Sequence, residues 1–136
     1  MGKQWALRAV LMALAGCEGG PRVASPAQPS SQAQQADLPS PEGFVSTGNA
    51  VNANPTGAWR VVNQTLEGRN RRIGTAADFY RDAWPRLGWT LEDASGDARN
   101  GPLTLVFTKR SERARLELQD SGREIVVIRL HVEKKD

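Results

Sequence analysis

The chain has 136 residues and a formal net charge of +3, with one cysteine and one histidine. A chain of this length has room for one domain and not two. One cysteine excludes an internal disulfide framework and a multi-cysteine metal site, and one histidine excludes a zinc site built on two or three imidazoles. No apolar run approaches the roughly 18 residues of a membrane-spanning helix.

The first 16 residues have the pattern of a targeting segment. Lys3 and Arg8 are basic, and residues 9–15 are apolar but too few to span a bilayer. The segment leads into Leu14-Ala15-Gly16-Cys17, which resembles a bacterial lipobox at all four positions. The resemblance implies cleavage before Cys17 and acylation of that residue, which is therefore the predicted lipidation site. A plain secretory signal in which Cys17 is a chance residue is the alternative.

The residue after the cysteine bears on the choice of membrane. In bacteria with two membranes, the lipoprotein resemblance implies that an aspartate at this position retains the protein in the inner membrane. The residue here is Glu18, which favours the outer membrane.

Because a single acyl chain anchors only marginally, two or three chains on Cys17 would be needed for firm attachment.

Residues 17–57 are predicted to be a disordered tether rich in Pro, Gln and Ser. Six of the eight prolines and four glutamines lie in this segment, and large apolar side chains are sparse. Such a composition does not bury enough apolar surface to offset the entropy of ordering the chain. The segment is therefore expected to act as a spacer between the anchor and one folded domain, residues 58–136.

The charge of the domain argues against nucleic acid as a partner. Residues 58–136 hold 15 Lys and Arg against 12 Asp and Glu, and removal of residues 1–16 leaves the mature chain near +1. A nucleic-acid binder normally concentrates a much larger basic excess.

The hydrophobic pattern of the domain predicts a strand, a helix and then further strands. Residues 58–66 are β-rich, and Thr75 and Asp78 suggest the start of a helix over residues 75–87. The apolar stripe of this helix is expected at Phe79, Ala83 and Leu87. Pro85 lies inside the last predicted turn, where its missing N–H is expected to bend or weaken the end of the helix. Gly88 is expected to take the left-handed conformation at the C-terminus of the helix.

Three or four strands are expected after the helix, because apolar and polar residues alternate near residues 89–91, 103–108, 113–119 and 126–133. Period-two alternation is typical of an antiparallel sheet covered on one face. The predicted fold class is α+β, with a single helix packed on one face of a mostly antiparallel four- to five-stranded sheet in the order β-α-β-β-β-β.

A second resemblance rests on Phe79-Tyr80-Arg81 and on the run Trp84-Pro85-Arg86-Leu87-Gly88-Trp89. These residues are similar to an "FYR…LPxLGW" pattern in small domains of bacterial lipoproteins and secreted proteins of unknown function. The layout also looks loosely like the helix-grip domains of the barrel-assembly lipoprotein C component. The resemblance implies a fold and no activity.

The sequence offers little for catalysis. His131, the only imidazole, is predicted on the polar face of the last strand, without a partner serine in a nucleophile motif. The carboxylates Glu92, Asp93 and Asp97 lie in a turn-like segment and lack the spacing of a calcium loop. No phosphate-binding glycine motif occurs. No enzyme activity, cofactor or metal is predicted.

The candidate binding residues are Arg113, Arg115, Arg129 and His131, on the predicted polar face of the sheet. Arginine suits bidentate binding of phosphate or carboxylate. One interpretation is a surface for an anionic envelope component such as a lipid head group, lipopolysaccharide or peptidoglycan. The other is a solvated face whose arginines pair with Glu117 and Glu133 across strands.

The tryptophans also divide. Trp84 and Trp89 are expected in the core, whereas Trp59 is either core or an exposed ligand platform.

Taken together, the sequence predicts a membrane-anchored envelope lipoprotein whose domain binds or scaffolds another envelope protein, through the polar face of the sheet or an exposed strand edge. A binding module for an anionic envelope component is the alternative.

Overall fold

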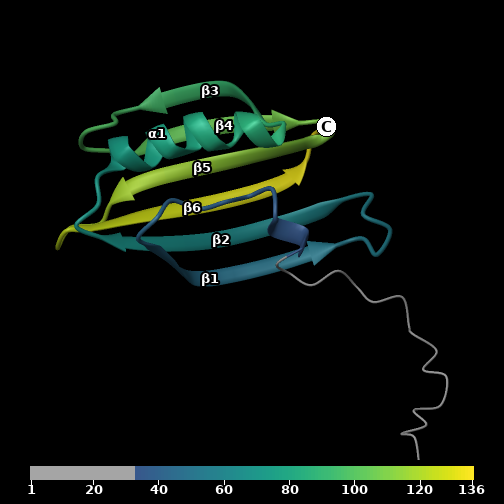
Figure 1. Cartoon of the computed structure of the whole chain (residues 1–136), viewed down its shortest axis with the longest axis horizontal. Coiled ribbons are helices and arrows are strands. Elements are labelled where there is room, and N and C mark those ends of the chain that lie inside the picture. The colour runs from purple at the N-terminus through teal and green to yellow at the C-terminus, as the bar shows by residue number, and fades with distance from the viewer. Residues whose placement is uncertain (1–32) are drawn as a thin grey trace, which may run out of the picture.

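A computed structural model describes residues 33–136 as one α-helix and one antiparallel sheet, with two short 3₁₀ turns (Figure 1). The elements in chain order are η1 (Ala33–Gln35), β1 (Phe44–Ala53), β2 (Arg60–Arg69), α1 (Ile73–Ala83), η2 (Pro85–Leu87), β3 (Thr90–Gly96), β4 (Leu103–Lys109), β5 (Glu112–Asp120) and β6 (Ile125–Lys134). None of the helices within residues 33–136 has the length and apolar character needed to cross a membrane.

The sheet has six strands in the order β1-β2-β6-β5-β4-β3, and every neighbouring pair is antiparallel. The last strand, β6, lies between β2 and β5, so it joins the hairpin β1-β2 to the meander β3-β4-β5. The edges of the sheet are β1 and β3. The α+β class, the single helix and the antiparallel sheet are confirmed, but the strand count of four to five is wrong.

The sixth strand comes from residues that the sequence analysis assigned to the tether. β1 occupies Phe44–Ala53 and pairs along its whole length with β2. Of its side chains, only Phe44 and Val51 pack against the core. A strand with so little alternation resembles a polar linker in sequence, which is why composition alone missed it. The sheet therefore begins at Phe44, before the expected domain boundary at residue 58.

Residues 34–41, which we call the strap, were also assigned to the tether. The strap crosses the face of the sheet that α1 covers, in front of β6 and β2 (Figure 1). Leu38 is buried at 5% exposure. The indole Nε1–H of Trp84 donates to the carbonyl of Pro39 at 3.1 Å, and that of Trp89 donates to the carbonyl of Asp37 at 2.9 Å. The strap thus closes the part of the core that α1 leaves open.

The helix begins two residues earlier than expected, at Ile73, with Arg72 as its N-cap and no side-chain cap hydrogen bond. Thr75 is therefore not the cap. Ile73 is 2% exposed, and burial of its side chain accounts for the earlier start. The residues that α1 buries lie three or four apart along the chain and are Ile73, Ala76, Ala77 and Tyr80.

The helix ends four residues before the expected residue 87, whereas the left-handed conformation predicted for Gly88 is confirmed. α1 stops at Ala83, η2 starts at Pro85, and Gly88 takes a left-handed φ of 94°. The expected burial of Leu87 is wrong, since its side chain is 38% exposed. The tighter 3₁₀ turn rotates this position away from the helical stripe that would have buried it.

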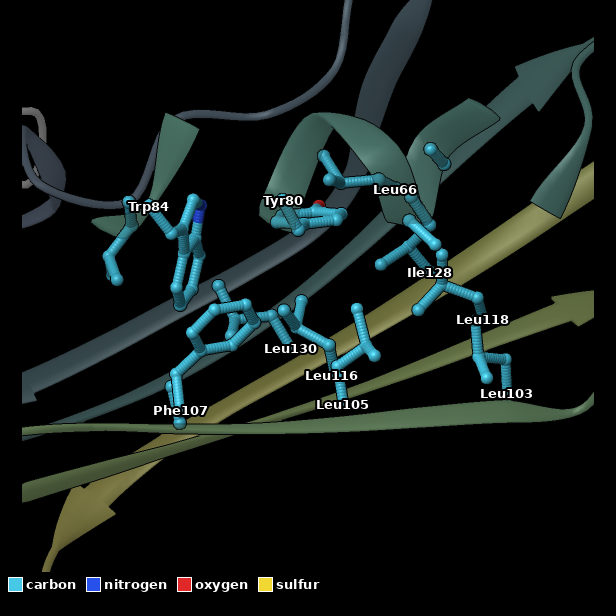
Figure 2. Packing of buried hydrophobic residues seen from close by; sticks show 14 of the residues in the cluster. Leu66, Tyr80, Trp84, Leu103, Leu105, Phe107, Leu116, Leu118, Ile128 and Leu130 are labelled. Atoms are coloured by element: carbon cyan, nitrogen blue, oxygen red, sulfur yellow. The ribbon is translucent and has the colours of Figure 1, made fainter. Parts of the chain in front are cut away.

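The core lies between α1, the strap and the covered face of the sheet (Figure 2). Trp84 and Trp89 are 0% and 1% exposed, so their predicted core positions are confirmed. Their ring centroids lie 5.1 Å apart, and the ring of Phe107 lies 5.1 Å from that of Trp84. Figure 2 shows Tyr80 and Trp84 directed towards the leucines and Phe107 of the sheet. Burial raises the pKa of the Tyr80 phenol, which keeps it neutral.

Candidate interaction surfaces

The face of the sheet that α1 and the strap do not cover, which we call the open face, carries the predicted binding residues. Arg113 and Arg115 lie on β5, and Arg129 and His131 lie on the neighbouring strand β6. Their neighbours in the alternation, such as Ala114 and Leu130, are buried on the covered face. The structure therefore brings the four predicted residues together on one surface. The predicted lipidation site, Cys17, lies outside the described residues.

Much of the charge on the open face is matched within the domain. Arg129 Nη1 lies 3.6 Å from Glu117 Oε1, and the two residues are direct cross-strand partners. Arg113 stands opposite Glu133 in the register of β5 and β6. The expected cross-strand partners, Glu117 and Glu133, are thus the residues facing these arginines. Exposed pairs of this kind contribute little to stability, but they lower the net field of the surface.

His131 is held by two neighbours on the open face. Its Nδ1 lies 2.7 Å from the side-chain oxygen of Asn63, and its Nε2 lies 3.3 Å from Glu133 Oε2. Neither ring nitrogen faces a hydroxyl or a thiol in these contacts. The arrangement orients the imidazole as part of the surface, and it supplies no nucleophile for the ring to activate.

A shallow hollow of about 360 Å³ lies on the open face. Its lining residues are Glu92, Asp93, Val106, Arg113, Arg115, His131 and Glu133. Glu92 and Asp93, which were expected in a loop, belong to β3. They line the same hollow as the arginines of β5. Two arginines against three carboxylates give the hollow no excess positive charge. The sequence could not place these groups together, since the order of the strands was not readable from it.

A second hollow, of about 390 Å³, lies at the end of the sheet where the turns after β1 and β4 meet. Trp59 lines it and is 39% exposed, so this tryptophan is on the surface and not in the core. Lys109 at the end of β4 and the two residues of the following turn, Arg110 and Ser111, line the opposite side of the hollow. The core interpretation of Trp59 is therefore wrong, and the ligand platform stays a prediction.

The floor of this second hollow is an ion-pair cluster that the sequence analysis missed. Asp37 contacts Arg60 Nη1 at 2.8 Å and Lys109 Nζ at 3.0 Å, and Arg60 Nε contacts Glu112 at 2.7 Å. Burial alone would raise the pKa of Asp37, but the hydrogen bonds from Arg60 and Lys109 hold that pKa below its ordinary value. Burial alone would lower the pKa of Arg60, but its hydrogen bonds to Asp37 and Glu112 raise that pKa above its ordinary value. These charges are matched, so their role is to fasten the strap.

The arginines before α1 do not form a free basic patch. A hollow of about 550 Å³ at the start of the helix is lined by Arg71, Arg72 and Arg99, but also by Asp78 and Asp120. The guanidinium of Arg71 lies against Gly43, where a β-carbon would come within 2.1 Å of it. Within residues 33–136, no group of three or more potential metal ligands is clustered.

The two edges of the sheet differ in character. β1 has ten residues, none of them charged, and the uncharged run extends from residue 43 to residue 59. β3 has seven residues, is exposed throughout, and carries Glu92 and Asp93 at a register shift between Leu91 and Asp93. Charge and a bulge protect an edge from pairing with another strand. By this criterion β3 is protected at its middle, and β1 is the less protected edge.

Comparison with known proteins adds no family: the chain matches no family model, no curated protein and no solved structure.

Proposed function

We propose that the protein is a lipid-anchored component of the bacterial envelope whose domain binds another envelope protein and has no enzymatic activity. The observation that carries this proposal is the open face, a sheet surface without a covering layer among the described residues. The lipobox-like Leu14-Ala15-Gly16-Cys17 supports the anchor, and Glu18 favours the outer membrane.

The geometry of the anchor follows from the described part of the chain. The structure begins at Ala33, so at most 16 peptide steps separate Cys17 from the domain. A fully extended chain covers about 3.4 Å per residue, which limits the reach to roughly 55 Å. On this proposal the domain works close to the membrane that holds it.

The balance of charge on the open face favours a protein partner. Arg129 and Arg113 each face a glutamate across the strands, and the hollow between β3 and β6 has more carboxylates than arginines. A mixed, well-spaced pattern of charge gives orientation and specificity in protein contacts. A polyanion would instead be attracted by an unopposed excess of positive charge.

An anionic envelope component remains the second candidate, on one observation. Arg113 and Arg115 lie two residues apart on the same face of β5, and neither is in a salt bridge within residues 33–136. Two neighbouring guanidinium groups can bind one phosphate or carboxylate in a bidentate manner.

The anchor is tested by the intact mass and the membrane fraction of the full chain beside the Cys17→Ser variant. The expected result is a wild-type chain that begins at Cys17, carries acyl mass and sediments with one membrane, while the variant shows none of these three properties. A soluble, unacylated wild-type chain would overturn the anchor and leave a secreted binding domain.

The two partner classes separate by salt and by charge reversal. The triple change Arg113→Glu, Arg115→Glu and Arg129→Glu should abolish binding of anionic vesicles, and raised ionic strength should weaken such binding steeply. A protein contact of matched charges should change little with salt. Steep salt dependence of partner capture from solubilised membranes would therefore reject the protein-partner proposal.

Absence of catalysis is tested on His131, the one imidazole. If the protein showed a hydrolytic or transfer activity that His131→Ala abolished, the non-catalytic proposal would fail.

A further inference from the structure

The β1 edge carries an inference that goes beyond the proposed binding role. We infer that β1 pairs antiparallel with β1 of a second copy of this chain, so that two six-stranded sheets join into one continuous sheet. Four features of the described structure lead to this conclusion: the position of β1, its regular segment, its lack of charge and the side chains that flank it.

Within residues 33–136, one row of the backbone groups of β1 has no strand beside it. β1 is the first strand in the sheet order and pairs with β2 alone among the described strands. Its residues are mostly exposed, and Val45 reaches 66% exposure. Unpaired N–H and C=O groups along such an edge are a template for another strand.

The regular part of β1 is long enough for a strand pair. A register shift lies between Ser46 and Gly48, and from Gly48 to Ala53 each residue has one partner on β2 without interruption. Six residues are the usual length of a strand in a globular protein. The bulge therefore protects the start of β1 and leaves this segment open.

The lack of charge selects a second copy as the occupant. In an antiparallel pair related by a two-fold axis, charged residues near the axis meet their own copies, and like charges at opposite positions destabilise a strand pair. β1 has no charged residue, so self-pairing brings no such repulsion. A foreign strand chosen by charge would find no complementary group on β1. β3 would bring Glu92 and Asp93 towards their copies.

The side chains beside the edge are small on the open face. A shallow hollow of about 470 Å³ extends over β1, β2 and β6, and Gly48, Ala50, Asn63, Thr65, Arg129 and His131 are among its lining residues. Gly48 stands in one row with Thr65 and Arg129, and Ala50 in one row with Asn63 and His131. Pairing of two β1 strands would join two such hollows across the axis, with Arg129 and His131 of each copy at the rims.

The symmetry of the pair suits two anchored chains. Strands of one sheet that pair antiparallel are related by an axis perpendicular to the sheet, so both copies present the same face to the same side. The strap enters on the covered face, so the two described chains would both begin on that side. Both chains of the pair could thus be anchored in the same membrane. This statement rests on the proposed anchor, whereas the inference that the two strands pair does not.

The size of the contact sets its expected strength. One strand from each copy forms an interface below the roughly 1,200 Å² of a standard stable complex. Association is therefore expected to be weak in free solution and stronger where both chains are held at one surface, since tethering raises the effective concentration.

The test uses the full chain with Cys17→Ser as a soluble background, and compares Ala50→Lys and Ala50→Glu by sedimentation velocity over a concentration series. The background chain should form dimers as its concentration rises. Each charged variant should need about fivefold more protein for the same dimer fraction, because like charges then meet across the axis. An equimolar mixture of the Lys and Glu variants should restore pairing, since opposite charges then meet.

The matched control is Ser95→Lys on the β3 edge, which should leave the dimer fraction unchanged. Ala50 is exposed, so circular dichroism should report an unchanged fold for both variants. A background chain that stays monomeric up to millimolar concentration would overturn the inference. An unchanged dimer fraction in both Ala50→Lys and Ala50→Glu would also overturn the inference, because the chains would then associate through another surface. Neither result bears on acylation of Cys17.

Discussion

The two halves of this sheet are held and protected in different ways. On the β1 side, the edge strand has no charge, and the strap fastens the adjoining core through Leu38 and the backbone of Asp37 and Pro39. On the β3 side, the edge strand is short, exposed and acidic. The strap is held by buried contacts that reach across the chain, and one of them ends at Trp89, the residue directly before β3. β3 itself pairs with β4 alone among the described strands.

The strength with which an edge strand is held in the domain therefore differs from its availability for pairing with another strand. β1 is the longer edge strand and pairs with β2 along its whole length, yet its outer row of backbone groups has the weaker protection against another strand. β3 is shorter and exposed throughout, and its carboxylates protect it. A rigid and uncharged edge is suited to specific pairing, because little backbone order has to be gained on association. A loose and charged edge is suited to staying single.

The largest expected effect comes from removing the buried side chain of the strap. Leu38→Ala should lower the free energy of unfolding by about 2–4 kcal/mol, because Leu38 is 5% exposed and its loss leaves a cavity in the core beneath the strap. The matched change on the other half is Leu91→Ala, at a side chain 37% exposed, which should cost about 1 kcal/mol or less. Urea unfolding of both variants measures the contrast, and equal losses would show that the strap is not part of the cooperative core.

The next effect comes from the ion pairs of the strap. Asp37→Asn removes the carboxylate that Arg60 and Lys109 contact, and should cost about 1–3 kcal/mol at pH 7. The folded pKa of Asp37 is lowered. Its stabilisation is therefore complete above the ordinary carboxyl pKa of about 3.9 and is lost as the pH falls through the lower folded value.

The pH dependence supplies the measurement for Asp37. The thermal unfolding temperature of the wild type should fall as the pH is lowered below about 4. The unfolding temperature of Asp37→Asn should depend less on pH in that range, because this variant has no carboxylate to protonate at position 37. Asp97→Asn is the control on the β3 side. The pKa of Asp97 is also lowered, through a backbone hydrogen bond from Arg99, but this carboxylate is exposed. An acid profile altered as strongly by Asp97→Asn as by Asp37→Asn would contradict the assignment.

The smallest effect on stability is expected at the β3 edge. The double change Glu92→Thr and Asp93→Thr keeps residues that favour strands and should alter the free energy of unfolding by less than about 0.5 kcal/mol. It should nevertheless make the protein associate more readily, because it removes the charges that guard this edge. Light scattering over a concentration series checks this result. Unchanged scattering would mean that the bulge between Leu91 and Asp93 protects β3 without help from charge.

The same comparison explains what could be predicted from the sequence. β4, β5 and β6 alternate strictly, since one face of each is buried under α1, and their polar residues were placed correctly on the open face. β1 and β3 lack that alternation because edge strands bury little. β3 is exposed at every position, so its second half looked like a loop.

Other features depended on contacts that no local pattern records. The strap is ordered by two indole N–H groups and a cluster of ion pairs, and its partners lie 45 to 72 residues away along the chain for Trp84, Trp89 and Lys109. The position of Asp93 and Arg115 in the same hollow depends on both the order of the strands and the bulge in β3. The local composition of residues 34–57 therefore predicted a linker, although long-range contacts stabilise a folded segment there.

The strap also has a mechanical consequence. If the chain is held at Cys17, a pull on that anchor reaches the domain first at the strap, and not at β1. Asp37 passes this load to Arg60 at the start of β2 and to Lys109 at the end of β4, and Arg60 shares it with Glu112 at the start of β5. Tension would then be spread over three strands at one end of the sheet, so the edge strand would be shielded from being peeled away.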